Sequence, residues 1–152
     1  MKIFVAVYEP LPCRFKPFQV VRDLGCVPFV YVDLGKPSVG PDSNVHIEAR
    51  EDMSAAQLLF VIMPISKIAL DWSEIWVLSE LQQFVKAGVR GQLFLYADCD
   101  PLNLSDKLAL LESRFAIQPQ IFDQLPDLEA ALRFSIKLQL PMNSQDSSSD
   151  CV

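Results

Sequence analysis

The sequence predicts an α/β fold with a mostly parallel five-stranded sheet and helices on both faces. Strand-like and helix-like segments alternate along the chain with short connections, which is typical of right-handed crossovers between parallel strands. Residues 58–63, LLFVIM, are apolar without alternation, so both faces of this strand should be covered. Five strands in this alternation favour the flavodoxin-like order 2-1-3-4-5, in which ligands bind at the carboxyl ends of the first and third strands.

The first strand and helix are expected before residue 26. Residues 3–7 are apolar throughout, and the pair Glu9-Pro10 closes the run. Pro17 suits the first turn of a helix, because that position needs no N–H donor. Gly25 then ends the helix near residue 24.

The second strand and helix are expected on either side of a long loop. Residues 27–34, VPFVYVDL, are rich in β-formers, and Pro28 is tolerated there if the strand lies at a sheet edge. The loop 35–44, GKPSVGPDSN, is dense in turn formers. A helix capped by residue 42 or 43 should follow and run to about residue 53.

The third helix is the best marked in the sequence. Pro64 ends the third strand because it has no N–H to donate. Asp71 and Glu74 have the spacing of a capping box at a helix start. An apolar stripe at helical spacing follows, and Gly88 ends it.

The last third of the chain completes the sheet. We expect a strand at 92–97, a helix capped by Ser105 up to residue 114, a weaker strand at 117–122, and a final helix opened by Pro126. A single domain is therefore predicted for residues 1–141. Residues 142–152, MNSQDSSSDCV, are mostly polar and are predicted to be a disordered tail.

Composition excludes several classes of function. The formal net charge is −6 and the pI is about 4.7, which disfavours nucleic-acid binding. No apolar run is long enough to cross a membrane, and the N-terminal segment lacks a signal-peptide pattern, so a cytoplasmic protein is expected. Four cysteines without C-x-x-C spacing and one histidine do not indicate a zinc site.

Motifs for common chemistries of this architecture are also missing from the sequence. There is no glycine-rich phosphate loop and no G-x-S-x-G nucleophile motif. The third strand ends in Met63-Pro64 rather than in the aspartate that a phosphate-accepting receiver needs. Asp33, Asp98 and Asp100 at strand ends could bind a hard cation, but aspartates more often cap turns there, and we predict no metal site.

The remaining candidate site surrounds a glutamate on the third helix. Ser73, Trp76 and Glu80 fall on one flank of the apolar stripe, at the border of the expected crevice. Tyr8 and Ser66 follow the first and third strands and should face the same crevice. An ordinary helix glutamate with Trp76 as a packing residue explains the pattern equally well.

These residues give the chain a resemblance to the TIR superfamily, including the related SEFIR domains. The motif from Trp76 to Leu81, WVLSEL, is similar to the family's tryptophan-to-glutamate motif, and residues 2–8, KIFVAVY, resemble its first-strand box. The loop at 35–42 takes the place of the family's assembly loop, and within it we select the following residues as an interaction surface: Gly35, Lys36, Gly40 and Pro41.

The resemblance implies one of two activities. The first is signalling or defence by self-association, or by association with another TIR-like domain. The second is cleavage of NAD⁺ as a substrate, with Glu80 as the catalytic carboxylate and Trp76, Ser73, Ser66 and Tyr8 at the substrate. A nucleotide-binding module without turnover is a third alternative, and no bound cofactor is expected.

Overall fold

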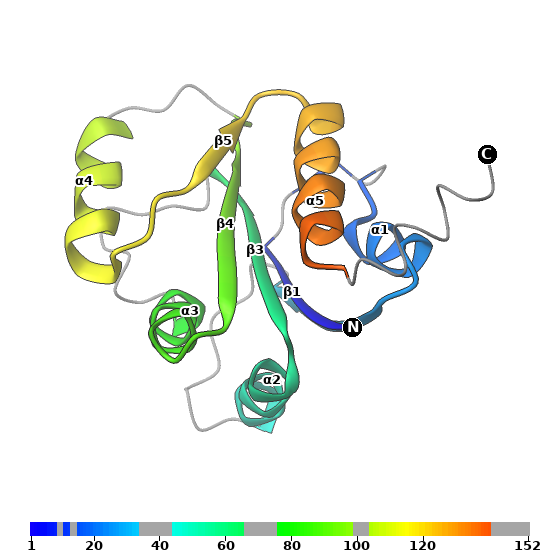
Figure 1. Ribbon diagram of the computed structural model, residues 1–152. Helices are drawn as coiled ribbons and strands as arrows, with labels where there is room; N and C mark the ends of the chain where they lie inside the picture. Colours follow the sequence, from blue (N-terminus) through cyan, green and yellow to red (C-terminus); the bar gives the residue numbers. More distant parts are fainter. Residues whose placement is uncertain (9–10, 13–14, 34–43, 66–75, 99–103, 141–152) are drawn as a thin grey trace.

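The computed structural model describes residues 1–8, 11–12, 15–33, 44–65, 76–98 and 104–140. Its sheet has five parallel strands in the order β2-β1-β3-β4-β5, which confirms the predicted fold class (Figure 1). The strands are β1 (Lys2–Tyr8), β2 (Val27–Asp33), β3 (Leu58–Pro64), β4 (Arg90–Tyr96) and β5 (Gln120–Phe122). The helices are α1 (Pro17–Asp23), α2 (Asn44–Ala55), α3 (Trp76–Lys86), α4 (Leu104–Phe115) and α5 (Leu125–Gln139).

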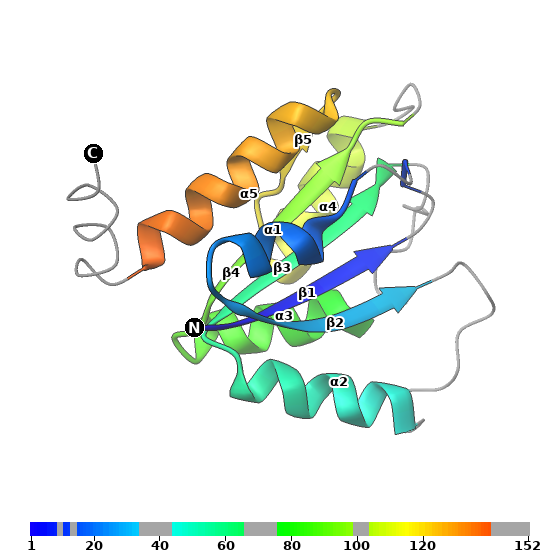
Figure 2. The same cartoon turned by 90° about the vertical axis from the view of Figure 1, so that its right-hand side faces the viewer.

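The helices cover both faces of the sheet. Helices α1 and α5 lie on one face, and α2, α3 and α4 lie on the other (Figures 1 and 2). This division follows from the strand order, because the crossovers from β2 to β3 and from β3 to β4 advance in the same direction across the sheet. Right-handed crossovers therefore put α2 and α3 on a common face.

Strand β3 is the centre of both hydrophobic cores. Each of its residues is buried, and it pairs with β1 on one side and β4 on the other. Leu59, Val61 and Met63 enter the core beneath α2, α3 and α4. Alternate residues of β3 enter the core beneath α1 and α5, where Phe60 stacks on Phe94 with ring centroids 5.6 Å apart. The prediction of a doubly covered third strand is confirmed.

Local signals in the sequence account for several element ends. Among the described strands, β2 pairs only with β1, so Pro28 does lie in an edge strand. Gly25 after α1 and Gly88 after α3 have positive φ angles of 77° and 98°. These left-handed conformations suit glycine, which has no Cβ to clash, and they confirm both predicted helix stops.

Other boundaries differ from the expectation. Strand β5 has only three residues instead of the six predicted, because Pro119 directly before it has no N–H for the ladder. Helix α4 already includes Leu104, so Ser105 lies inside the first turn and is not the cap. Strand β4 starts two residues earlier than expected, at Arg90. The predicted capping box, Asp71 with Glu74, falls outside the described residues.

Helix α3 approaches the sheet closely at Gly91 of β4. A Cβ added there would overlap Cδ1 of Leu81 and lie 3.1 Å from Cγ2 of Val85. Leu81 is itself buried in the core and cannot easily move aside. The absence of a side chain at Gly91 therefore lets α3 rest on β4 and sets the position of Glu80.

Within the described ranges, no helix is long and apolar enough to cross a membrane.

Candidate functional site

The flanks of two neighbouring helices bring Glu80 and Arg50 together. On α3, Leu78 and Leu81 point into the core, so Glu80 between them projects from the side of the helix. On α2, Met53 is fully buried, and Arg50 lies one turn before it. Because α2 and α3 share a face of the sheet, the two side chains meet in the space between the helices.

Arg50 and Glu80 form a hydrogen-bonded ion pair. Arg50 Nε donates to Glu80 Oε1 at 3.0 Å. The Glu80 side chain retains 17% of its surface exposed, and that of Arg50 retains 36%. Solvent reaches the pair and screens it, so its contribution to stability is about 1 kcal/mol or less. The pair fixes the direction of the carboxylate and neutralises its charge.

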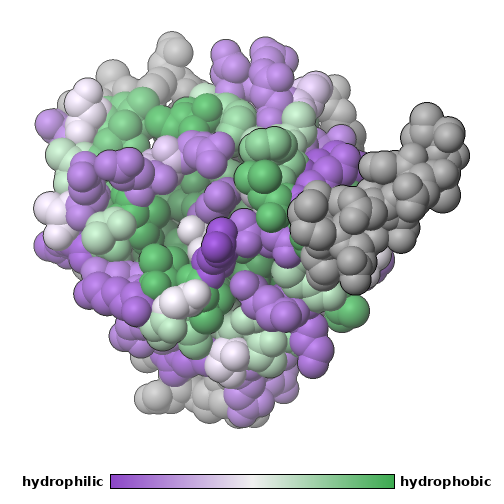
Figure 3. Space-filling view, in the orientation of Figure 1, coloured by the Kyte–Doolittle hydropathy of each residue, from purple (hydrophilic) through white to green (hydrophobic). Residues whose placement is uncertain are grey.

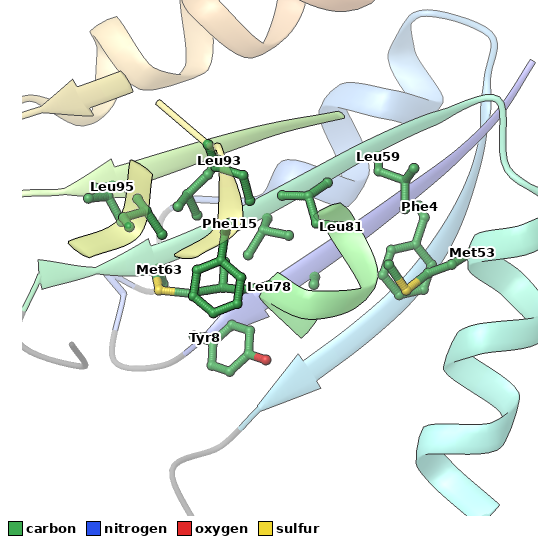
Figure 4. Packing of buried hydrophobic residues seen from close by; sticks show 14 of the residues in the cluster. Phe4, Tyr8, Met53, Leu59, Met63, Leu78, Leu81, Leu93, Leu95 and Phe115 are labelled. Carbon is green, nitrogen blue, oxygen red and sulfur yellow. The ribbon is translucent and has the colours of Figure 1, made fainter. Parts of the chain in front are cut away.

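Tyr8 lies at the carboxyl end of β1 on the same face of the sheet as Glu80. Its residue surface is 3% exposed, and its ring packs in the cluster that contains Leu78 and Met63 (Figure 4). The ring therefore packs on the buried side of α3, the helix that carries Glu80. Its predicted contact with a substrate stays a prediction.

The other predicted substrate-binding residues are only partly described. Trp76 is the first residue of α3, one helical turn before Glu80, and its side chain lies outside the description. Ser66 and Ser73 lie outside the described residues altogether. The same holds for the predicted interaction surface, Gly35, Lys36, Gly40 and Pro41. The structure thus brings together Glu80, Tyr8 and the backbone of Trp76 on one face.

Arg50 is the residue that sequence reasoning missed. The strand order and right-handed crossovers already imply that α2 and α3 are neighbours. The sequence also spaces Arg50 three residues from the buried Met53, which marks a helix flank. What it does not give is the axial position of α2 relative to α3, which decides whether Arg50 or another polar residue reaches Glu80.

Metal-ligand geometry is missing from the part of the chain that the structure describes. No three His, Cys, Asp or Glu residues come together there. Asp98 is exposed just after β4, the side chain of Asp33 is not described, and Asp100 lies outside the described residues.

No protein-family model matches this chain, and a search of curated proteins also found no match. The class of protein is therefore defined by the structure alone. Its parallel sheet in the order 2-1-3-4-5, covered on both faces, is a flavodoxin-like α/β fold.

Proposed function

We propose that this chain is a signalling or defence domain of TIR/SEFIR type that acts by association with itself or with another domain of the same type. Two features support the proposal. The order of elements matches the family's fold, and Trp76 and Glu80 have the family's spacing on the helix after the central strand. The net charge of −6 favours protein partners over nucleic acids. A cytoplasmic setting is part of the proposal.

The observation that favours association over catalysis is the ion pair of Glu80 with Arg50. A glutamate that stabilises a developing cation must offer a net negative charge at the reacting centre. The guanidinium 3.0 Å from Glu80 offsets that charge and occupies one carboxylate oxygen. In this arrangement Glu80 links α2 to α3 and its carboxylate is already engaged.

Measurement of molar mass against protein concentration tests this proposal. We expect sedimentation velocity to show reversible oligomers, and Lys36→Glu in the predicted interaction loop to weaken them. Lys16→Glu is the matched control, because it makes the same charge change at an exposed position beside α1. A chain that stays monomeric up to millimolar concentration overturns the proposal.

A second candidate is hydrolysis of NAD⁺ at Glu80. The observation that favours it is a partly exposed carboxylate held in one direction by Arg50. Beside the nicotinamide ribose, such a carboxylate would stabilise an oxocarbenium-like state, as in glycosidases, while water supplies the oxygen that replaces nicotinamide.

Nicotinamide release from NAD⁺ tests this second candidate. Glu80→Gln should abolish release while the thermal melting midpoint stays within a few degrees of the wild-type value. Glu51→Gln on α2 is the control, because Glu51 is exposed and its side chain can be neutralised without touching the pair. Wild-type protein that releases no nicotinamide contradicts the candidate.

A further inference from the structure

Helix α5 carries a stripe of exposed residues on the side that faces away from the sheet. The buried residues of the helix are Leu125, Leu128, Leu132, Ser135 and Ile136. A second set, spaced by three and four positions, is exposed: Asp127, Ala130, Phe134 and Lys137. Residues with this spacing lie along one side of a helix. We call these residues the α5 outer stripe.

The contacts of α5 fix the direction of the stripe. The hydroxyl of Ser135 donates to Gln92 Oε1 of β4 at 3.0 Å, so that side of the helix faces the sheet. On the flank toward α1, Arg133 Nη2 lies 3.8 Å from Oδ2 of Asp23. The outer stripe lies opposite the buried residues, and no other described helix or strand covers α5 there (Figure 2). A second molecule therefore has access to the stripe.

The centre of the α5 outer stripe is apolar. Phe134 is 63% exposed, the highest value among the large hydrophobic residues in the described ranges, and Ala130 lies one helical turn before it. Leu138, which is 62% exposed, extends the apolar surface on the flank toward β4. In Figure 3, apolar residues are visible at the position of α5, among hydrophilic ones. Burial of this centre against a partner would be favourable.

The ends of the stripe carry opposite charges. Asp127 lies in the first turn of α5 and Lys137 in the last turn, and both are exposed. The stripe is symmetric about Leu132: Ala130 and Phe134 are two positions away from it, and Asp127 and Lys137 are five positions away. At a rise of about 1.5 Å per residue, each charged residue lies roughly 7.5 Å along the helix from the level of Leu132.

We propose that the α5 outer stripe is a homodimer surface, and that its occupant is the same stripe on a second copy of this chain. The two helices run antiparallel, and a two-fold axis passes between them at the level of Leu132. This symmetry places Asp127 opposite Lys137 of the second copy, and Phe134 opposite Ala130 of the second copy. Each of these contacts occurs twice, as in any two-fold interface.

Charge and size together select a second copy in this orientation. Both carboxylates meet an ammonium group, and each Phe134 ring packs over an alanine, which leaves room for it. A parallel pair would instead oppose aspartate to aspartate, lysine to lysine and ring to ring. An anionic membrane would be repelled by Asp127 and by the exposed Asp123 just before the helix.

The size of the surface sets the strength of the dimer. One pair of 15-residue helices buries less than the roughly 1,200 Å² at the lower end for stable complexes, so the dimer is weak and reversible. This inference rests on the self-association proposed above and gives it a location, which is separate from the loop at 35–42.

Charge reversal with mixing tests the orientation. Asp127→Lys and Lys137→Asp should each raise the dimer Kd about 10-fold or more, because each homodimer then opposes like charges twice. An equimolar mixture of the two variants should associate as tightly as the wild type, since the heterodimer restores both ion pairs. Sedimentation velocity measures the affinity. A mixture that associates no better than either variant alone overturns the proposal.

Two matched controls lie on the other face of the sheet. Asp106 is in the first turn of α4 and Lys86 in the last turn of α3, and both are exposed. Asp106→Lys and Lys86→Asp make the same charge changes at equivalent helix positions and should leave the dimer Kd unchanged. Effects as large as those on α5 would come from net charge and would overturn the proposal. Thermal melting confirms that each variant is folded.

An exchange of large and small residues tests the apolar centre. Phe134→Ala should raise the dimer Kd about 10-fold or more, as expected for a central aromatic contact. The double variant Ala130→Phe/Phe134→Ala should bring the Kd back toward the wild-type value, because each ring again faces an alanine. Val27→Ala is the control, because Val27 is 52% exposed on β2. A double variant as weak as Phe134→Ala alone overturns the pairing.

The results also separate this inference from the proposed function. Oligomers that survive the α5 variants but dissociate with Lys36→Glu overturn the α5 surface and leave the proposed function standing. A wild-type chain that stays monomeric overturns both. A monomeric chain that floats with phosphatidylcholine vesicles also overturns both, and assigns the stripe to a membrane surface instead.

Discussion

Arg50 of α2 donates a hydrogen bond to the carboxylate of Glu80 on α3 at 3.0 Å, and so links two helices that lie side by side on the sheet. The glutamate is thereby held by a side chain from a neighbouring helix. Its partner limits what it can do chemically, because the positive guanidinium must be displaced or reoriented before the carboxylate can act on another cation.

A double-mutant cycle measures the strength of this link. We expect Arg50→Met and Glu80→Gln to show a coupling free energy of about 0.5–1 kcal/mol in urea unfolding, since the pair is partly exposed and screened. Pairing Arg50→Met with Glu51→Gln is the control and should show no coupling. Equal coupling in both cycles would mean that the effect comes from net charge rather than from the contact.

A side chain at Gly91 should destabilise the fold. Gly91→Ala places a methyl group against the buried Leu81 and close to Val85, and we expect a loss of about 1–3 kcal/mol from overpacking. Urea unfolding measures the loss. The double variant with Leu81→Val should lose less than the sum of the two single changes, because the smaller side chain makes room. Simple additivity would contradict the close approach of α3.

The aromatic contacts of β4 give a third prediction. Phe94 stacks on Phe60 and meets Phe122 edge to face, both at 5.6 Å between ring centroids. Phe94→Ala should cost about 3–5 kcal/mol, through lost burial and the cavity left behind. Phe134→Ala, measured at a concentration where the chain is monomeric, should cost less than about 0.5 kcal/mol, because that ring is already in solvent.

Cys26 should be slow to react and should make stability sensitive to alkaline pH. Burial raises the pKa of the Cys26 thiol above its ordinary value, so the folded state favours the neutral form. The unfolded chain loses this proton first, and stability therefore falls as the pH rises through and beyond about 9, the ordinary pKa. Between pH 7 and pH 10, the difference in unfolding free energy between wild type and Cys26→Ala should stay constant near neutral pH and change only at the alkaline end.

Alkylation provides an independent check on Cys26. Iodoacetamide attacks the thiolate, which is scarce and shielded in the folded chain. Mass spectrometry should show the Cys26 peptide labelled much more slowly in buffer than in urea. Equal rates in both solvents would contradict burial of the thiol.

Much of the fold was predictable because its determinants are local. An apolar run without alternation marks a strand covered on both faces, and Gly25 and Gly88 supply the left-handed residues that end helices. The boundary errors are also local in origin. Strand β5 was predicted too long because a β-rich run was given more weight than the missing N–H of Pro119. The predicted cap of α4, Ser105, lies within the first turn of that helix.

The amino-acid sequence by itself determined the type and order of the elements, and their alternation favoured the strand order 2-1-3-4-5 that the structure has. It also marked Glu80 as a residue on a helix flank. Only the tertiary structure decided that Arg50 meets Glu80, that α3 packs closely on Gly91, and that Phe134 and Leu138 of α5 stay exposed to solvent. The physical reason is that these relationships depend on the axial and rotational placement of helices against the sheet. Side-chain packing across the whole core sets that placement, and the spacing of apolar residues within one segment does not determine it.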